Sequence, residues 1–261
     1  MLVLLPPSET KNDGGSGGTL DLGSLRFPSL TPTRRAVLRS VAELSRDREA
    51  SIRALKLGPK QHGEVDRNRR LRRSPTMPAI ELYSGVLYDA FDVGTLSPTE
   101  RERTQDVVAI HSALFGLVSA GDSIPPYRLS FDSRVPGTTL KRSWTAPVST
   151  VLERTTGVIV DLRSDGYAAL GPLPTGKEAV TVRVLGRDAE GRVRALNHFN
   201  KQAKGLFARA IVASGLELAD AEQLLDWARA EGYDVGLNGS ELELTVSQVT
   251  GEPGRLMAAL R

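Results

Sequence analysis

The sequence lacks cysteine altogether, and its 261 residues include only three histidines. The missing thiols exclude a disulfide framework, a thiolate nucleophile, cysteine-bound zinc and cysteine-bound iron–sulfur clusters. The histidines, at positions 62, 111 and 198, are too scattered to indicate a multi-histidine metal centre. A metal site without these residues would need a set of carboxylate ligands, and no spacing of acidic residues indicates one. We therefore predict no metal site and no cofactor.

Long apolar runs are also missing. No stretch approaches the roughly 20 apolar residues that a membrane-spanning helix needs. The N-terminal MLVLLPP is too short for the apolar centre of a signal peptide. We expect a cytoplasmic protein without membrane contacts. The 34 basic and 31 acidic side chains nearly balance, which permits an anionic partner without requiring one.

The common catalytic signatures are absent as well: the sequence has no GxxxxGK[ST], strand-borne GxGxxG, HExxH or GxSxG. Short apolar strands instead interleave with amphipathic helices. Residues 3–5 and 158–160 are predicted to be buried strands of a parallel sheet. Residues 180–185 and 193–196 are predicted to pair as a hairpin. A long helical segment is predicted to start at Thr33 and to end at Gly58.

Two further segments have clear local signals. Ser97, followed by proline and by Glu100, is typical of a capped helix start. Residues 107–118 indicate the end of a helix, a buried strand and a tight turn near Gly116. We predict a mixed α/β (α+β) protein with a mixed sheet surrounded by helices, in a single compact domain over residues 1–261.

Polar residues are concentrated directly after the predicted strands. Glu9 and Lys11 follow the first strand, and Arg163 and Ser164 follow residues 158–160. Proteins of the α/β class commonly place ligand-binding groups at these carboxyl ends. Taken alone, the segment with Glu9 and Lys11 would be a solvated turn.

A double proline fixes the chain before Tyr127 and Arg128. A guanidinium held in this way could bind a phosphate or carboxylate with two hydrogen bonds. Pairing of Arg128 with a nearby acid such as Asp122 is an equally good interpretation.

Basic residues also open a predicted helix. Lys201 and Lys204 follow His198 and would share one helical face near an N-terminus, where anions are favoured. A lone histidine is more often a capping or core residue than a catalytic base.

A run of five arginines spans residues 67–73 and includes Arg67 and Arg70. Such a run could contact a phosphate backbone. Glu64 and Asp66 intervene, and a solvated charged helix face is the commoner structure.

Five segments occur in a distinctive order along the chain: MLVLLPPSETK, PAIELYSGVLYDAF, SALFGLVSAGDSIPPYRLS, VIVDLRSDGYAALGPLP and HFNKQAKGLFAR. Together they resemble the YaaA family of bacterial peroxide-stress proteins. The resemblance implies a cytosolic protein of one compact mixed α/β domain with a positively charged cleft. It also implies a role in the response to hydrogen peroxide, by limiting free iron and the oxidative damage that iron causes.

The same resemblance implies binding of double-stranded DNA through a helix–hairpin–helix-like element, which falls by position on residues 112–122. The nucleic-acid or anion-binding residues of the cleft would be Lys11, Tyr127, Arg128, Arg163, Ser164, Tyr167, Lys201 and Lys204, with Arg67 and Arg70 from the arginine run.

Three positions depart from the better-known family pattern. Ala113 stands in place of a glycine, and Ser130 and Gly166 stand in place of acidic residues. The first change weakens the expected grip of the hairpin on DNA. The loss of two carboxylates weakens any acid–base mechanism that would use them and leaves the cleft more positive.

Two functional hypotheses follow. The first is a stress protein that binds duplex DNA through its basic residues. The second is an enzyme acting on a phosphorylated or carboxylated small molecule, with Glu9, Lys11 and His198 as candidate catalytic residues. No nucleophile–base pair in the sequence identifies a reaction.

Overall fold

A mixed β-sheet organises the chain. The computed structural model describes residues 1–187, 193–195 and 198–247. The strand order is β4-β3-β1-β6-β7-β10-β9, and β8 pairs with β7. Five neighbouring strands run parallel, whereas β4, β8 and β9 are antiparallel to their partners. The strands are β1 Leu2–Leu5, β3 Val108–Ser112, β4 Gly116–Ser119, β6 Ile159–Asp161, β7 Ala179–Arg187, β8 Val193–Ala195, β9 Asp234–Asn238 and β10 Glu241–Ser247, and a separate pair is formed by β2 Met77–Pro78 and β5 Ser123–Ile124.

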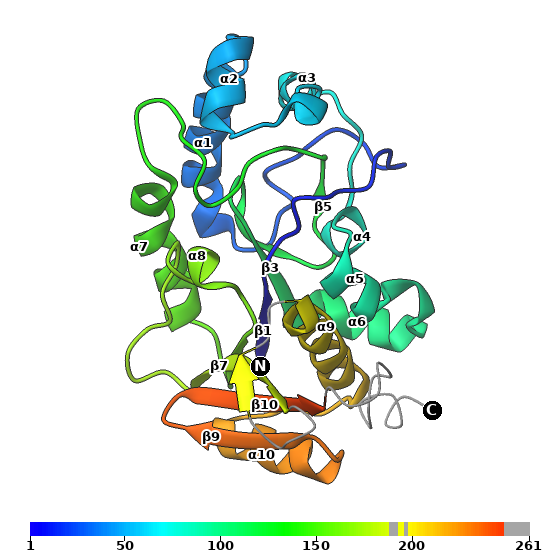
Figure 1. Ribbon diagram of the computed structural model, residues 1–261. Coiled ribbons are helices and arrows are strands. Elements are labelled where there is room, and N and C mark those ends of the chain that lie inside the picture. Colours follow the sequence, from blue (N-terminus) through cyan, green and yellow to red (C-terminus); the bar gives the residue numbers. More distant parts are fainter. Residues whose placement is uncertain (188–192, 196–197, 248–261) are drawn as a thin grey trace.

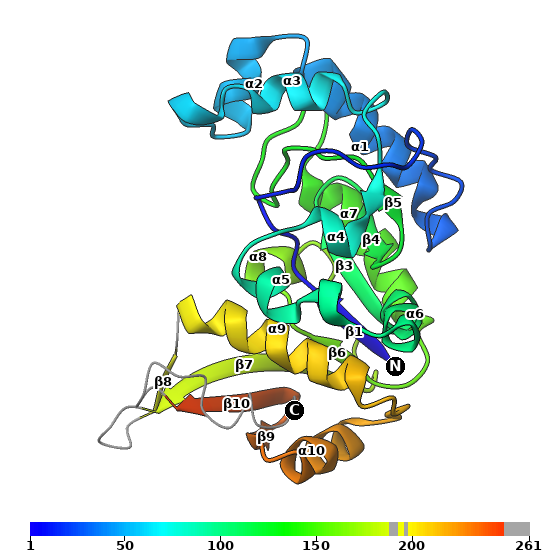
Figure 2. The ribbon, with the colours of Figure 1, turned by 90° about the vertical axis from the view of Figure 1, so that its right-hand side faces the viewer.

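Helices cover both sides of this sheet. Helix α7 packs against α1 and β4, whereas α9 packs against α5, α6 and β7, and Figure 1 shows α7 and α9 on opposite sides of β1. Helix α10 packs against β9, at the opposite end of the molecule from α2 and α3 (Figure 2). The helices are α1 Thr31–Leu44, α2 Arg48–Ala54, α3 Glu64–Arg69, α4 Ala79–Leu82, α5 Val86–Phe91, α6 Pro98–Val107, α7 Leu140–Glu153, α8 Asp165–Ala168, α9 His198–Ala213 and α10 Ala221–Ala230, with short 3-10 turns at Pro28–Leu30, Pro59–Gln61 and Val93–Thr95.

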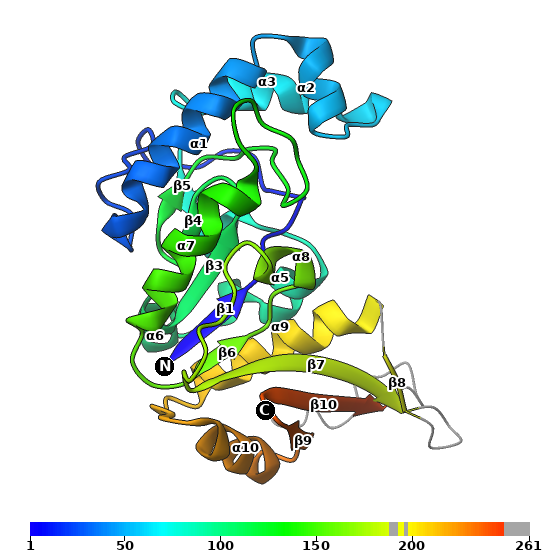
Figure 3. The same ribbon diagram turned by 90° about the vertical axis from the view of Figure 1, so that its left-hand side faces the viewer.

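The structure confirms the predicted mixed α/β class and its strongest local signals. All four residues of β1 are buried, and β1 lies between β3 and β6 in parallel register. Strands β7 and β8 pair as the predicted hairpin. Ser97 caps α6 reciprocally: its hydroxyl accepts from the Glu100 N–H, and the Glu100 carboxylate accepts from the Ser97 N–H. Figure 3 shows the long strands β7 and β10 crossing below the shorter ones.

Two helical segments differ from the prediction. The long helix expected from Thr33 is two helices, because the chain turns after Leu44 and the Asp47 carboxylate caps α2 by accepting from the Ala50 N–H. Helix α7 was not predicted. It contains Pro147 in its interior, and it buries Trp144 and four aliphatic side chains against the sheet side of the fold.

The expected helix–hairpin–helix-like element at residues 112–122 is wrong for this chain. These residues form the end of β3, a tight turn and β4, which pair as an antiparallel hairpin. The turn is buried: the Trp144 Nε1 donates to the Ala113 carbonyl, and the buried Arg34 donates to the carbonyls of Phe115 and Leu117. Residues 112–122 therefore form a buried β-hairpin and contain no pair of helices.

No helix among the residues that the structure describes has the length and apolarity needed to cross a membrane.

Gly116 is required in the turn of this hairpin. Its φ is +67°, and a Cβ there would lie 2.6 Å from Cζ3 of Trp144. We expect Gly116→Ala to lower the free energy of unfolding by about 2–4 kcal/mol, because strain and overpacking act together. Gly137→Ala is the matched control, since its φ is +77° with nothing within 4 Å. Urea denaturation measures both, and equal losses would contradict the packing argument.

Candidate functional site

The candidate site lies where three parallel strands end together. Strands β1, β3 and β6 run in the same direction, so the segments that follow them meet at one edge of the sheet. Lys11 and Arg163 lie in the segments after β1 and β6, and Ser112 is the last residue of β3. The sequence analysis expected Lys11 and Arg163 at strand ends, and the structure places both there.

Lys11 is buried among aromatic rings and backbone carbonyls. Its Nζ lies 4.4 Å from the ring centre of Tyr127 and 5.3 Å from that of Tyr83. The amine donates to the carbonyl oxygen of Ser8 at 2.9 Å and to that of Glu9 at 3.4 Å. Among the described residues, no carboxylate forms an ion pair with it. A buried ammonium without an acidic partner is costly, and deprotonation relieves that cost.

The pKa of Lys11 is correspondingly lowered to about 7. Burial is the largest cause, and the positive charge of Arg128 is the next. The charge of Arg67 also lowers the pKa, whereas those of Glu64 and Glu9 raise it. At neutral pH the amine is therefore present in both its charged and its neutral form.

A chain of hydroxyl groups runs beside Lys11. The Tyr83 and Tyr127 oxygens are 2.7 Å apart, and the Tyr127 oxygen is 2.7 Å from Oγ of Ser112. Oγ of Ser112 accepts from the N–H groups of Leu114 and Phe115. Both acceptor positions of this hydroxyl are thereby used, so its proton goes to Tyr127. Tyr127 in turn donates to Tyr83. The proton of the Tyr83 hydroxyl is therefore not used within this series of hydrogen bonds.

Asn68 holds the backbone of Arg128, and the Arg128 guanidinium pairs with an exposed acidic side chain. The Asn68 side chain accepts from the Arg128 N–H and donates to its carbonyl, both at 2.8 Å. Nη2 of Arg128 donates to Oε2 of Glu9 at 2.9 Å. The Arg128 side chain is 10% exposed and that of Glu9 is 64% exposed. The acid that pairs with Arg128 is therefore Glu9, and Asp122 instead accepts from the N–H groups of other residues.

Arg163 faces inward. Its Nε and Nη2 donate to the two carboxylate oxygens of Asp161 at 2.8 and 2.6 Å, and its Nη1 contacts Nδ1 of His111 at 2.8 Å. All three side chains are buried. Burial and the Arg163 charge lower the pKa of His111, which keeps the imidazole neutral. All three guanidinium nitrogens of Arg163 thus have partners within the protein. One of these partners, Asp161, is the last residue of β6, so the contact fixes the end of this strand.

Tyr167 lies near His111 and interacts electrostatically with Tyr127 and Glu9. Its ring centre lies 6.1 Å from that of His111, and its pKa is raised by burial and by the neighbouring Tyr127 and Glu9. Nζ of the buried Lys204 donates to the Arg163 carbonyl at 3.3 Å. Burial lowers the pKa of Lys204.

The remaining predicted residues lie farther out. Ser164 is exposed at the start of α8, and Lys201 is exposed in the first turn of α9. His198 begins α9, and its side chain lies outside the described residues. In α3, Arg67 forms ion pairs with Asp13 and Glu64.

Arg70, which follows α3, is exposed and donates to a backbone carbonyl of that helix.

Two of the departures from the family pattern have a local explanation. A Cβ at Gly166 would lie 2.5 Å from Cε2 of Phe131, whose ring packs edge-on against Tyr167. An acidic side chain there would require Phe131 to move. Oγ of Ser130 donates to the Asp132 carboxylate at 2.7 Å, so a carboxylate occurs two residues beyond the position where one was lost.

The sequence analysis missed several residues of the site: Asn68, Tyr83, His111, Ser112 and Asp161. Tyr83 lies in a matched segment, PAIELYSGVLYDAF, and Asp161 lies two residues before the predicted site residue Arg163. Both could have been found from these positions. Asn68 and His111 carry no sequence signal, because their contacts come from segments 60 and 52 residues away.

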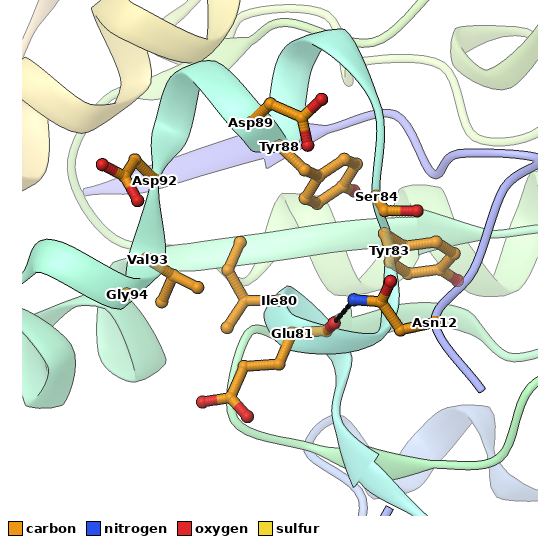
Figure 4. A pocket seen from close by; sticks show the side chains of 10 residues that line it. All are labelled: Asn12, Ile80, Glu81, Tyr83, Ser84, Tyr88, Asp89, Asp92, Val93 and Gly94. Carbon is orange, nitrogen blue, oxygen red and sulfur yellow. Dashed lines mark hydrogen bonds between the residues drawn. The ribbon is translucent and has the colours of Figure 1, made fainter. Parts of the chain in front are cut away.

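A shallow pocket of about 290 Å³ adjoins the other side of Tyr83. Figure 4 shows Asn12, Tyr83 and Tyr88 on its wall, with Asp89 and Asp92 nearby. Glu81 also lines it, so its charge is negative rather than positive. Its carboxylates already have partners: Glu81 pairs with Arg101, Asp89 accepts from a backbone N–H, and Asp92 accepts from a threonine.

Fold and site together define a mixed α/β protein that gathers buried basic side chains at the carboxyl edge of its parallel strands. The chain belongs to the family described as peroxide stress protein YaaA, whose sequence profile matches residues 1–237. It is 43% identical over 248 residues to a UPF0246 protein of Corynebacterium efficiens, covering 93% of this chain and 98% of that one. It is 39% identical over 242 residues to a UPF0246 protein of Streptomyces coelicolor, covering 90% and 92%. These matches confirm the resemblance seen in the five segments.

The lowered pKa of Lys11 predicts a pH-dependent stability. Between pH 7 and 10.5 the unfolded chain keeps a proton on this amine, whereas the folded protein has lost it. Stability therefore rises with pH in this window, by up to about 1.4 kcal/mol per pH unit for this one group. Lys11→Met removes the contribution. Urea denaturation at pH 7, 8 and 9 gives the free energy of unfolding at each pH. We expect this free energy to rise less steeply with pH in the variant than in the wild type, and an identical rise in both would contradict the lowered pKa of Lys11.

Proposed function

We propose that this protein binds a small anionic compound, phosphorylated or carboxylated, at the site around Lys11 and Arg128. The observation that supports this proposal is the Arg128–Glu9 contact. A well-held, largely buried guanidinium is paired there with a carboxylate on a mostly exposed loop residue. A ligand carboxylate or phosphate can replace Glu9, because a guanidinium binds either group in the same geometry.

Burial favours a small molecule over a polymer at this position. Lys11, Arg128 and Lys204 are each less than one-tenth exposed. The backbone of a DNA duplex contacts side chains that project from a surface. A small compound could instead replace the Glu9 carboxylate, whose side chain is 64% exposed, at the Arg128 guanidinium.

Replacement of Glu9 gives a direct test. Glu9→Gln should tighten binding of succinate and of inorganic pyrophosphate about two- to fivefold, since an exposed ion pair no longer competes. Arg128→Met should weaken binding about tenfold or more, because a charge-assisted hydrogen bond is lost. Isothermal titration calorimetry measures both effects. Glu241→Gln, which removes an exposed carboxylate paired with Arg183, should leave binding unchanged. Equal affinities for all four proteins would refute the proposal.

The second candidate function is binding of duplex DNA, and one observation favours it. Arg70, Arg72 and Arg73 are exposed, and salt-sensitive phosphate contacts need such projecting cations. These three arginines are not among the buried side chains of the site, and they do not belong to the hairpin at residues 112–122.

The DNA hypothesis predicts a change in salt dependence. Arg72→Gln with Arg73→Gln should reduce the slope of log affinity against log salt by roughly 2, about 0.9 per phosphate contact. Arg154→Gln with Arg229→Gln removes the same charge from two other exposed positions and should leave the slope unchanged. Fluorescence anisotropy with a labelled duplex provides the measurement. Absence of binding at low salt would end this hypothesis.

The family relationship supports placing either activity in the response to peroxide. We propose that the protein helps to limit iron-driven oxidative damage through the compound or the DNA that it binds.

A further inference from the structure

The residues around Lys11 suggest a specific chemistry for the proposed anion site. Lys11 presents an amine that is buried without an acidic partner among the described residues. Its neighbours are two aromatic faces and the cation Arg128. Apolar surroundings and a nearby positive charge both favour the neutral amine, which is the nucleophilic form.

Glu9 contacts both functional groups of this site. Its backbone carbonyl oxygen lies 3.4 Å from the Lys11 Nζ, and its carboxylate lies 2.9 Å from the Arg128 Nη2. One residue thus presents a carbonyl to the amine and an anion to the guanidinium. A ligand carboxylate or phosphate can replace the Glu9 side chain at Arg128, and a carbonyl a few bonds away on the same ligand would then lie toward the Lys11 amine.

The hydroxyl chain supplies a proton donor on Tyr83, whose ring centre lies 5.3 Å from the Lys11 Nζ. Two backbone N–H groups fix the direction of donation from Ser112 through Tyr127 to Tyr83. In this direction of donation, the Tyr83 hydroxyl is the acceptor in its hydrogen bond with Tyr127. Burial raises the pKa of Tyr83 well above its usual range, so the phenol stays protonated. Tyr83 is therefore a hydrogen-bond donor whose proton is free for a ligand.

We propose that Lys11 forms an imine with a small carbonyl compound that carries a carboxylate or phosphate, while Arg128 holds the anionic group and Tyr83 protonates the carbonyl oxygen. The lone pair of the amine forms a bond to the carbonyl carbon, and the oxygen takes the proton from Tyr83. The nitrogen then gives up both of its protons: one goes to the hydroxyl, which leaves as water, and the other returns to the Tyr83 oxygen and restores the phenol. One water is released for each imine, and no oxidant or reductant is needed.

The inference rests on the proposed anion site and is tested by trapping. The protein is incubated with succinic semialdehyde and sodium cyanoborohydride at pH 7, and labelled lysines are located by peptide mass spectrometry. We expect Lys11 to be labelled at least about tenfold faster than the exposed Lys60. Butanal has a carbonyl and no anion, and it should show no preference for Lys11.

Variants separate the roles of the three residues. Lys11→Arg should bind succinate and form no adduct at position 11. Tyr83→Phe removes one oxygen atom and should slow labelling of Lys11 about 100-fold, the lower range for a positioned general acid, while succinate binding persists. Arg128→Met should abolish the preference for succinic semialdehyde over butanal. A thermal melt of each variant verifies folding.

The outcomes distinguish this inference from the proposed function. Succinate binding without an adduct at Lys11 would overturn the imine and leave the anion site standing. Absence of both would overturn both. Equal labelling of Lys11 by succinic semialdehyde and butanal would overturn the role of Arg128, and unchanged labelling in Tyr83→Phe would overturn that of Tyr83.

Discussion

The parallel pairing of β1 on both of its sides is the constraint on which this structure depends. Four apolar residues at the N-terminus bond to β3 on one side and to β6 on the other. Because all three strands run in the same direction, the chain segments that leave them share one edge of the sheet. Lys11, Ser112 and Arg163 come together for this reason, although more than 150 residues of sequence separate the first from the last.

The arrangement of cations at this edge is energetically unfavourable. Lys11 is buried without an acidic partner among the described residues, and Arg128 shares its charge with an exposed glutamate. By contrast, Arg163 is neutralised by two hydrogen bonds to Asp161. Asp161 thus neutralises the inner cation, whereas Lys11 and Arg128 are the cations to which we propose that an anionic ligand binds. Natural proteins commonly retain such unfavourable arrangements where they act on a ligand.

Local patterns identified much of the fold, and their failures have physical causes. The buried strands and the Ser97 cap were predictable, because a short apolar run and a capping box act within a few residues. Helix α7 was not, because Pro147 interrupts the usual helix pattern and packing of Trp144 stabilises the helix all the same. The element expected at residues 112–122 was wrong because hydrogen bonds from Arg34 and Trp144, both distant in sequence, hold it as a buried hairpin.

The sequence by itself determined the fold class, the family and the concentration of basic residues behind the strands. These properties follow from short-range patterns and from the order of five segments. Only the tertiary structure decided which basic residues turn inward, as Arg163 does, and which meet the solvent, as Lys201 does. It also brought Tyr83 and Tyr127 to Lys11. The charge and reactivity of an amine depend on burial and on neighbours from other segments, and the linear sequence specifies neither.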